Sequence, residues 1–383
     1  MNEMKKVTER ENLKKYLYAN PEGTLFITHN DADGLACIVA DVVFRSEGSK
    51  KIELISHINE TKMKEIYKIV GVNQVEDTIY EYVRIHQNLP KTIIITDLSF
   101  QKGCDDDLLD AINSLNKKGI LTIELYDHHK TATWLNDYEW AHITENPEYS
   151  AASYYALCKY KSIGVDLEND TRVAREQLAL WEFLQKIARY DTWKWKESPD
   201  YRTDEYPTLL IPVLGYWNWI SYVINAIFTG GNEYLDFLIK KICENQVYSR
   251  LERATASLEN VKEIHEWCTD VLPIDPVKTY LILGNHKINI LHEVVANHIP
   301  NDIPYLFCVL YPDTKTLSMR TVSDDIDCSE IAQQIAVNGK GGGHVKAAGC
   351  TISDELALML ITKYYQSNTS ILDIAGEPDT DIE

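Results

Sequence analysis

Three runs of β-branched and apolar residues, TLFIT (24–28), TIIIT (92–96) and ILTIELY (120–126), end directly in polar side chains that bind metals. Those side chains are His29, Asp31 and Asp33 after the first run, Asp97 after the second, and Asp127, His128 and His129 after the third. Continuous apolar runs are typical of strands buried in a parallel sheet, and the carboxyl ends of such strands meet at one edge. The sequence therefore predicts an α/β fold whose sheet brings these distant side chains into one crevice.

Between these runs the pattern changes to helical spacing. Apolar residues follow Gly34 at positions 35, 38, 39, 42 and 43, so the segment HNDADG (29–34) is expected in a strand-to-helix turn. The same reasoning predicts a strand at 52–56 and helices at 61–70, 150–160 and 171–190.

The chain is longer than one hydrophobic core usually organises, at 383 residues. From residue 278 onwards, strand and helix patterns alternate again around the segment GKGGGHVK. We therefore expect a metal-binding domain with a parallel sheet, a helical segment rich in Trp and Tyr that acts as insert or linker, a smaller α/β domain, and an acidic tail. Their expected ranges are 1–195, 196–275, 276–367 and 368–383.

The composition of the chain argues against several classes of protein. Acidic residues number 58 against 38 basic ones, a net charge of −20, which disfavours binding to long duplex nucleic acid because that needs many basic contacts to phosphates. Eight cysteines are scattered without a CxxC pair, which argues against a zinc ribbon or a disulfide framework. The sequence has neither a long apolar run nor an apolar signal region, so we expect a cytoplasmic protein without a membrane partner. The oligomeric state stays open between a monomer and a homodimer.

Carboxylates combined with imidazoles suit a divalent ion such as Mn²⁺ better than structural zinc. The residues expected to hold two such ions are His29, Asp31, Asp33, Asp97, His128 and Asp191. Asp97 stands alone at its strand end and is the natural bridge between ions about 3.5–4 Å apart. Taken singly, the histidines are more often structural and the aspartates are more often turn residues, and composition alone favours a surface position for Asp191. The joint pattern is what favours a metal site.

A glycine run in the C-terminal part is compatible with two interpretations. Gly341, Gly342 and Gly343 could form a linker, or their N–H groups could close around a phosphate with His344 and Lys346 beside them. Arg320 lies in an alternating strand, where it is either a surface charge or a two-pronged phosphate ligand.

Five motifs in order resemble those of the DHH phosphoesterase superfamily. They are HNDADG at 29–34, TDLS at 96–99, DHHK at 127–130, RYDTW at 189–193 and GGGH at 341–344. That family joins a catalytic DHH domain to a smaller DHH-associated domain, which presents the substrate. Within the family, DHHKTATWLN, RYDTWKW and GGGHVKAAGC are most similar to the bacterial nanoRNase B type, which degrades short oligoribonucleotides to mononucleotides.

The resemblance implies roles for individual residues of this chain. Asp31 and Asp33 would bind separate ions with Asp97 as their bridge, and the remaining ligands would be His29, His128 and Asp191. Only Asn30 separates His29 from Asp31, whereas relatives with a longer spacing bind that histidine directly. Other implied roles are an imidazole-orienting role for Asp127, a place facing the scissile phosphate for His129, and phosphate binding by Arg320 and His344.

The expected activity is a Mn²⁺-dependent phosphodiesterase that uses water activated by two metals to cleave oligonucleotides of two to five residues into nucleoside monophosphates. Rivals with the same metal centre are a cyclic or linear dinucleotide phosphodiesterase, a 3′-phosphoadenosine 5′-phosphate phosphatase and, less favoured, an inorganic pyrophosphatase. A binding or scaffold protein without catalysis is a rival of another class. It is disfavoured because every expected ligand is present.

Overall fold

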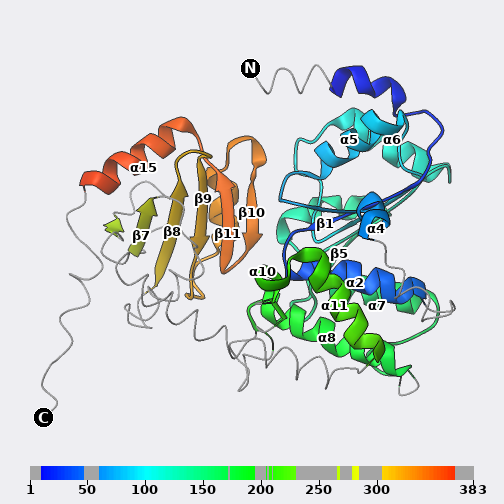
Figure 1. Cartoon of the computed structure of the whole chain (residues 1–383). Helices are drawn as coiled ribbons and strands as arrows, with labels where there is room; N and C mark the ends of the chain where they lie inside the picture. Colours follow the sequence, from blue (N-terminus) through cyan, green and yellow to red (C-terminus); the bar gives the residue numbers. More distant parts are fainter. Residues whose placement is uncertain are drawn as a thin grey trace, which may run out of the picture. The chain divides into compact units, whose positions relative to one another are not determined.

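The computed structural model describes residues 10–46, 60–170, 173–194, 204, 207–208, 210–229, 265–267, 278–283 and 304–366. The chain divides into two compact units, Met1–Glu244 and Asn245–Glu383 (Figure 1). The expected strand at 52–56 and the acidic tail at 368–383 lie outside the described residues. The domain boundaries expected from the sequence stay predictions.

The described part of the first unit contains alternating strands and helices. In chain order they are η1 (Lys14–Tyr16), β1 (Thr24–His29), α2 (Ala32–Ser46), α4 (Glu60–Ile66), β2 (Tyr67–Val70), α5 (Val75–His86), β3 (Thr92–Thr96), α6 (Asp106–Lys117), β4 (Thr122–Asp127), η2 (Lys130–Asp137), β5 (Ala141–Ile143), α7 (Ala151–Ser162), α8 (Arg175–Asp191), α10 (Ile211–Leu214) and α11 (Tyr216–Thr229).

The strands of the first unit form one parallel sheet in the order β2-β1-β3-β4-β5. Thr28 of β1 is level with Thr96 of β3, which is level with Tyr126 of β4. The three central strands therefore end at the same edge of the sheet, where each is followed by carboxylates or imidazoles. This confirms the α/β fold with a parallel sheet that the sequence predicts.

Helices cover both faces of this sheet (Figure 1). Leu25 and Ile27 of β1 pack in a core with α5 and α6, whereas the intervening Phe26 packs on the other face with α2, α7, α8 and α11. This alternation explains why the strands are apolar throughout, since each is buried on two sides. Helix α2 is buried along nearly its whole length, and it begins directly behind the end of β1.

Part of the expected aromatic-rich connecting segment packs within the first unit. Helices α10 and α11 lie in this segment, and α11 contacts α2 and α8. Trp219 is fully buried, and its indole N–H donates to the carbonyl oxygen of Pro207 at 2.8 Å. This tryptophan is therefore part of the hydrophobic core of the first unit.

The described part of the second unit is built on a mixed sheet. Its elements are β6 (His265–Trp267), β7 (Lys278–Leu283), β8 (Tyr305–Tyr311), β9 (Thr316–Arg320), α14 (Cys328–Ile335), η5 (Val337–Gly339), β10 (Gly341–His344), β11 (Ala347–Thr351) and α15 (Asp354–Gln366). The strand order is β10-β11-β9-β8-β7-β6, with β7 and β8 parallel and the other pairs antiparallel. Side chains from α14 and α15 pack on one face of this sheet.

Two local expectations differ from the structure. The helix expected at 61–70 ends at Ile66, and Tyr67–Val70 instead forms β2 at the edge of the sheet, beside β1. The glycine run, for which the sequence allows a linker or a phosphate-binding segment, forms the edge strand β10 because it pairs with β11 from Gly341 to His344. In the part of the chain that the structure describes, no helix has both the length and the apolar character needed to span a membrane.

Candidate metal centre

The end of β1 presents its ligands through a tight turn into α2. Asp31 caps that helix, since its Oδ1 accepts the N–H of Gly34 at 3.0 Å and its backbone oxygen accepts the N–H of Leu35 at 3.0 Å. A Cβ at Gly34 would lie 2.3 Å from the backbone oxygen of His29, so only glycine lets the helix begin this close to the strand. The Oδ2 atom of Asp31 is directed elsewhere, 2.5 Å from Nδ1 of His29.

A first group of ligand-type side chains, which we name position A, consists of His29, Asp31 and Asp97. One ligand atom from each residue lies within 4.8 Å of the others. Nδ1 of His29 is 2.5 Å from Asp31 Oδ2 and 3.6 Å from Asp97 Oδ2. Two strand ends, those of β1 and β3, therefore contribute to position A.

A second group, position B, consists of Asp33, His128 and Asp191, whose ligand atoms also lie within 4.8 Å of one another. Nε2 of His128 is 3.8 Å from Asp33 Oδ2 and 3.2 Å from Asp191 Oδ2. Position B combines the first turn of α2, the end of β4 and the last residue of α8. The surface position that composition favours for Asp191 is therefore wrong, because the end of α8 lies at the edge of the sheet where the strands end.

Asp97 touches both positions with different oxygens. Its Oδ2 faces His29 in position A, and its Oδ1 lies 3.6 Å from Nε2 of His128 in position B. The side chain is 2% exposed, and within the described residues Oδ2 has no hydrogen-bond donor. The backbone of Asp97 has φ 56°, a left-handed conformation that is uncommon outside glycine and that directs this carboxylate from the strand end.

The electrostatics of both positions reflect crowded charges. Burial raises the pKa of Asp33 well above its usual value, and the nearby carboxylates of Asp97 and Asp191 add to this rise. Burial opposes the charged form of His29, but Asp31 and Asp97 raise its pKa to about 11. Burial also opposes protonation of His128, yet Asp191 and Asp97 raise its pKa well above the usual value. Without cations, the imidazoles take up protons that partly balance the carboxylates.

Divalent cations fit this donor set. Carboxylate oxygens with imidazole nitrogens are ligands for ions of the Mn²⁺ type, and a buried carboxylate oxygen without a hydrogen-bond donor is a natural ligand atom. A bound cation would also relieve the repulsion among the aspartates and replace the protons on the imidazoles.

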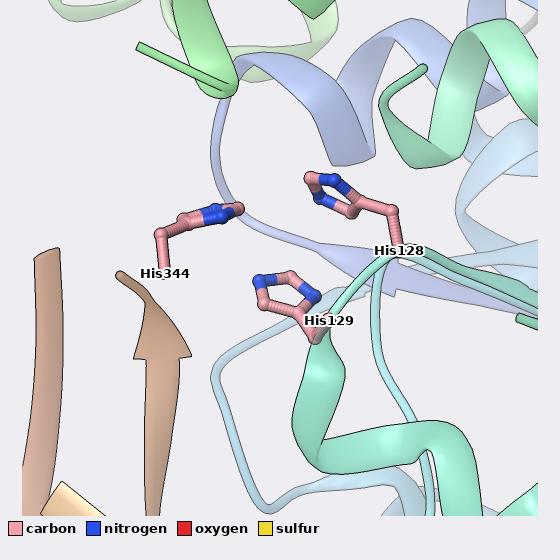
Figure 2. A group of neighbouring side chains, drawn as sticks. All are labelled: His128, His129 and His344. Atoms are coloured by element: carbon pink, nitrogen blue, oxygen red, sulfur yellow. The ribbon is translucent and has the colours of Figure 1, made fainter. Parts of the chain in front are cut away.

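Asp127 and His129 form a separate pair beside these positions. Oδ1 of Asp127 accepts Nδ1 of His129 at 2.7 Å and the backbone N–H groups of His128 and His129 at 2.8 and 3.2 Å. Burial opposes ionisation of Asp127, but the adjacent His129 holds the pKa of this carboxyl below its usual value. Asp127 thereby orients the imidazole of His129. The ring centroids of His128 and His129 are 4.6 Å apart. Both rings follow the end of β4 (Figure 2).

In the second unit, strand register places Arg320 and His344 in one row. Arg320 of β9 pairs with Ala347 of β11, which pairs with His344 of β10. Because residues paired across neighbouring strands share a face, Arg320 and His344 lie on the same face, roughly 10 Å apart across two strand spacings. Gly342 and Gly349 pair on this face as well. Between Arg320 and His344 the sheet therefore carries only small residues, which leave room for a ligand.

The other two glycines of the run have packing roles. A Cβ at Gly341 would lie 2.4 Å from the backbone oxygen of Ala332 in α14. Gly343 has φ 139°, and a Cβ there would lie 2.6 Å from the backbone oxygen of Ala347. These two glycines allow β10 to pack closely on α14 and β11.

Lys346 contacts a loop of its own unit. Its ammonium donates to Asp324 at 2.7 Å, to the carbonyl oxygen of Val322 at 3.4 Å and to that of Ser323. These bonds hold the segment that follows Arg320, which is an observed role beside the phosphate binding expected from the sequence.

Sequence reasoning missed the residues that hold Asp33. Its carboxylate accepts hydrogen bonds from Oγ of Ser150 and from the N–H groups of Ala151 and Ala152. The sequence signal for this arrangement is weak, because a serine at a helix start predicts a cap without naming its distant partner.

Comparisons with known proteins agree with this architecture. A model of the DHHA1 domain matches residues 285–369. Oligoribonuclease NrnB of Bacillus subtilis (strain 168) is 25% identical over 344 residues, which cover 88% of this chain and 75% of that protein. A solved DHH domain, described as a member of the s1p family of ribosomal proteins, is 16% identical with a TM-score of 0.55, and the match covers 92% of this chain and 88% of that one.

The solved domain supports the fold, while the DHHA1 match and the relative support the expected family. These findings confirm the resemblance seen in the sequence and the expected class of enzyme, a phosphoesterase. Its C-terminal part matches the DHHA1 domain, and the chain as a whole is similar to proteins of the DHH superfamily.

Proposed function

We propose that the protein is a Mn²⁺-dependent phosphodiesterase that hydrolyses short oligoribonucleotides to nucleoside monophosphates. The observation that carries this proposal is the pair of adjacent ligand groups, positions A and B, with one buried aspartate between them. Similarity to a relative named an oligoribonuclease supports the substrate class.

The metal ligands in this proposal are His29, Asp31 and Asp97 at position A and Asp33, His128 and Asp191 at position B, with Asp97 shared. When bound, two divalent ions lower the pKa of water and neutralise the charge that develops on the phosphate oxygens. Because the aspartate ligands are buried and hydrogen-bonded, they are already held in place, and the site needs little reorganisation when the substrate binds.

His129 acts on the reacting phosphate in this proposal. Its Nδ1 is held by Asp127, so the ring is oriented with Nε2 directed away from that carboxylate. Asp127 raises the pKa of His129 above its usual value, which favours the charged imidazole, and in that form the ring can bind a phosphate oxygen. Burial opposes this charge and is outweighed by the carboxylate.

The second unit contributes a phosphate-binding face in this proposal. Arg320 supplies paired N–H donors and His344 a further donor, while Gly342 and Ala347 leave room between them. Such a face suits the phosphate or the sugar edge of a short nucleotide better than a long duplex, which the net charge of −20 disfavours.

The test is Mn²⁺-dependent turnover of end-labelled RNA of two, three, five and about twenty nucleotides, with a cyclic dinucleotide and 3′-phosphoadenosine 5′-phosphate alongside. Preference for dimers to pentamers is the expected result, and the product ladder gives the direction of cleavage. Faster cleavage of the longest RNA would contradict the proposed substrate length. Turnover of only the cyclic dinucleotide or the bisphosphate would agree with the proposed metal centre but would contradict the proposed substrate.

The metal content of purified protein separates an enzyme from a scaffold. Two Mn²⁺ ions per chain are expected after equilibration and removal of unbound metal, whereas a scaffold without the centre would retain none. The expected cytoplasmic location and the choice between monomer and homodimer stay predictions.

A further inference from the structure

Helix α7 and Ser150 hold the carboxylate of Asp33 through contacts that are distant in sequence. Oγ of Ser150 donates to Asp33 Oδ1 at 2.5 Å, the N–H of Ala152 donates to Oδ1 at 3.1 Å, and the N–H of Ala151 donates to Oδ2 at 2.8 Å. Both Asp33 and Ser150 are fully buried. Asp33 therefore caps α7 from another element, and the cap residue Ser150 contributes its hydroxyl as a donor.

The two oxygens of Asp33 have different surroundings. Oδ1 receives two donors, whereas Oδ2 receives one and is the oxygen that lies 3.8 Å from Nε2 of His128 in position B. A carboxylate oxygen accepts along two lone-pair directions, so Oδ2 keeps one for another ligand. The hydrogen bonds at Oδ1 thus fix which oxygen turns toward position B.

Asp31 is held in a parallel way. Its Oδ1 caps α2 through the N–H of Gly34, and its Oδ2 faces His29 in position A. Each aspartate directs one oxygen to a ligand position, although that oxygen of Asp33 also accepts the N–H of Ala151. The difference is that Oδ1 of Asp31 is held by a backbone N–H, whereas Oδ1 of Asp33 also receives the hydroxyl of Ser150.

Because Asp33 and Ser150 are fully buried, the hydrogen bond from this hydroxyl has a larger effect on the carboxylate than it would have in water. Asp33 lies close to the like charges of Asp97 and Asp191, which disfavour its ionised form. Donors at a helix N-terminus and a hydroxyl in a buried site favour the anion and restrict its rotation. We infer that Ser150 is a positioning residue that holds Asp33 for the metal ion at position B, an inference that rests on the proposed two-metal centre.

The experiment is a Mn²⁺ titration of metal-free protein in which unbound Mn²⁺ is followed by its electron paramagnetic resonance signal. Ser150→Ala is expected to bind one of two ions about 10-fold more weakly than the wild type, in the range found when a group that orients a ligand is removed. Ser153→Ala is the matched control. Ser153 lies one turn along the same helix, is also fully buried and bonds to Ser150, but has no hydrogen bond to Asp33 among those of the described residues.

A merely structural role would lower the unfolding temperature of both variants without changing the Mn²⁺ affinity of either. Equal affinities of Ser150→Ala and Ser153→Ala would therefore overturn the inference. Ser150→Thr, which keeps the hydroxyl, is expected to restore at least part of the affinity, and an affinity no better than that of Ser150→Ala would also count against the inference. Wild-type protein that binds no Mn²⁺ would overturn the proposed metal centre itself, so the two failures are distinguishable.

Discussion

Nε2 of His128 lies 3.2 Å from Oδ2 of Asp191, so the end of β4 meets the last residue of α8. His128 is 5% exposed and Asp191 is 19% exposed, which places this contact at the inner part of the site. This contact brings two of the three residues of position B together from elements far apart in the chain.

Asp191→Asn should lower the affinity for one Mn²⁺ ion by about 10- to 100-fold or more, because a neutral amide replaces a charged ligand. Isothermal titration of the metal-free variant measures this change directly. Glu182→Gln is the control, since Glu182 lies on the exposed side of the same helix. Unchanged affinity in Asp191→Asn would remove this residue from the proposed ligands.

Two substitutions at Asp97 separate its charge from its backbone conformation. Asp97→Asn should abolish turnover while the metal-free protein stays at least as stable as the wild type, because burial and the neighbouring Asp31 raise the pKa of this carboxyl and disfavour its charge. Asp97→Ala should be less stable than Asp97→Asn by about 1 kcal/mol, since alanine tolerates the left-handed backbone less well than asparagine. Urea unfolding of both variants gives the comparison. Residual turnover near the wild-type rate in either variant would contradict the bridging role.

Gly34→Ala should disrupt the junction between β1 and α2, because the added methyl group would lie 2.3 Å from the backbone oxygen of His29. A loss of roughly 2 kcal/mol or more in unfolding free energy is expected from such overpacking. Gly71→Ala is a matched control, since its Cβ would meet nothing nearer than the Oε1 of Gln74 at 3.5 Å. Equal stability of the two variants in urea would show that the turn can relax.

Substitutions of two glycines in the second unit should distinguish an effect on packing from an effect on ligand binding. Gly341→Ala is expected to lower stability by roughly 1–3 kcal/mol because its Cβ meets the backbone of α14. Gly349→Ala should fold normally, since its nearest neighbour would be 3.4 Å away, but it adds a methyl group to the face of Arg320 and His344. A raised KM for short RNA with unchanged kcat is the expected result for Gly349→Ala. An unchanged KM would argue against substrate binding on this face.

Mn²⁺ binding should release protons. The pKa of His29 is raised from 6.5 to about 11, so this imidazole is a cation in the metal-free protein at neutral pH. Its pairing with Asp31 stabilises that form fully below about pH 6.5 and is lost as the pH rises through about 11. Ligation requires the neutral ring, so Mn²⁺ affinity should increase with pH over this window.

Titration calorimetry in two buffers with different heats of ionisation at pH 7.5 measures the protons released. His29→Gln should release about one proton fewer than the wild type if His29 binds the metal. Equal proton release by the two proteins would assign His29 a place beside the metal without direct binding.

The local pattern of the sequence was enough for the main elements of the first unit. Runs of β-branched residues predict β1, β3 and β4 within one or two residues of their bounds, because a strand buried on both faces must be apolar along its length. The ends of those strands then predict the convergence of His29, Asp31, Asp97 and His128. Parallel strands of one sheet share an edge whatever the connections between them are.

Packing decided what the local pattern left open. The segment 61–70 is amphipathic enough for a helix, yet its second half pairs with β1 because an edge of the sheet is available there. The glycine run 341–343 has no side chains to indicate a strand, and together with His344 it forms one through pairing with β11 and close contact with α14.

The sequence by itself determined which residues carry charge and donor atoms and which strands end in them, since these properties follow from residue type and short-range periodicity. Only the tertiary structure decided that Asp191 turns inward beside His128 and that Ser150 holds Asp33. Both contacts join elements that are far apart in the chain. Their partners are selected by how α7 and α8 pack against α2, which no local pattern specifies.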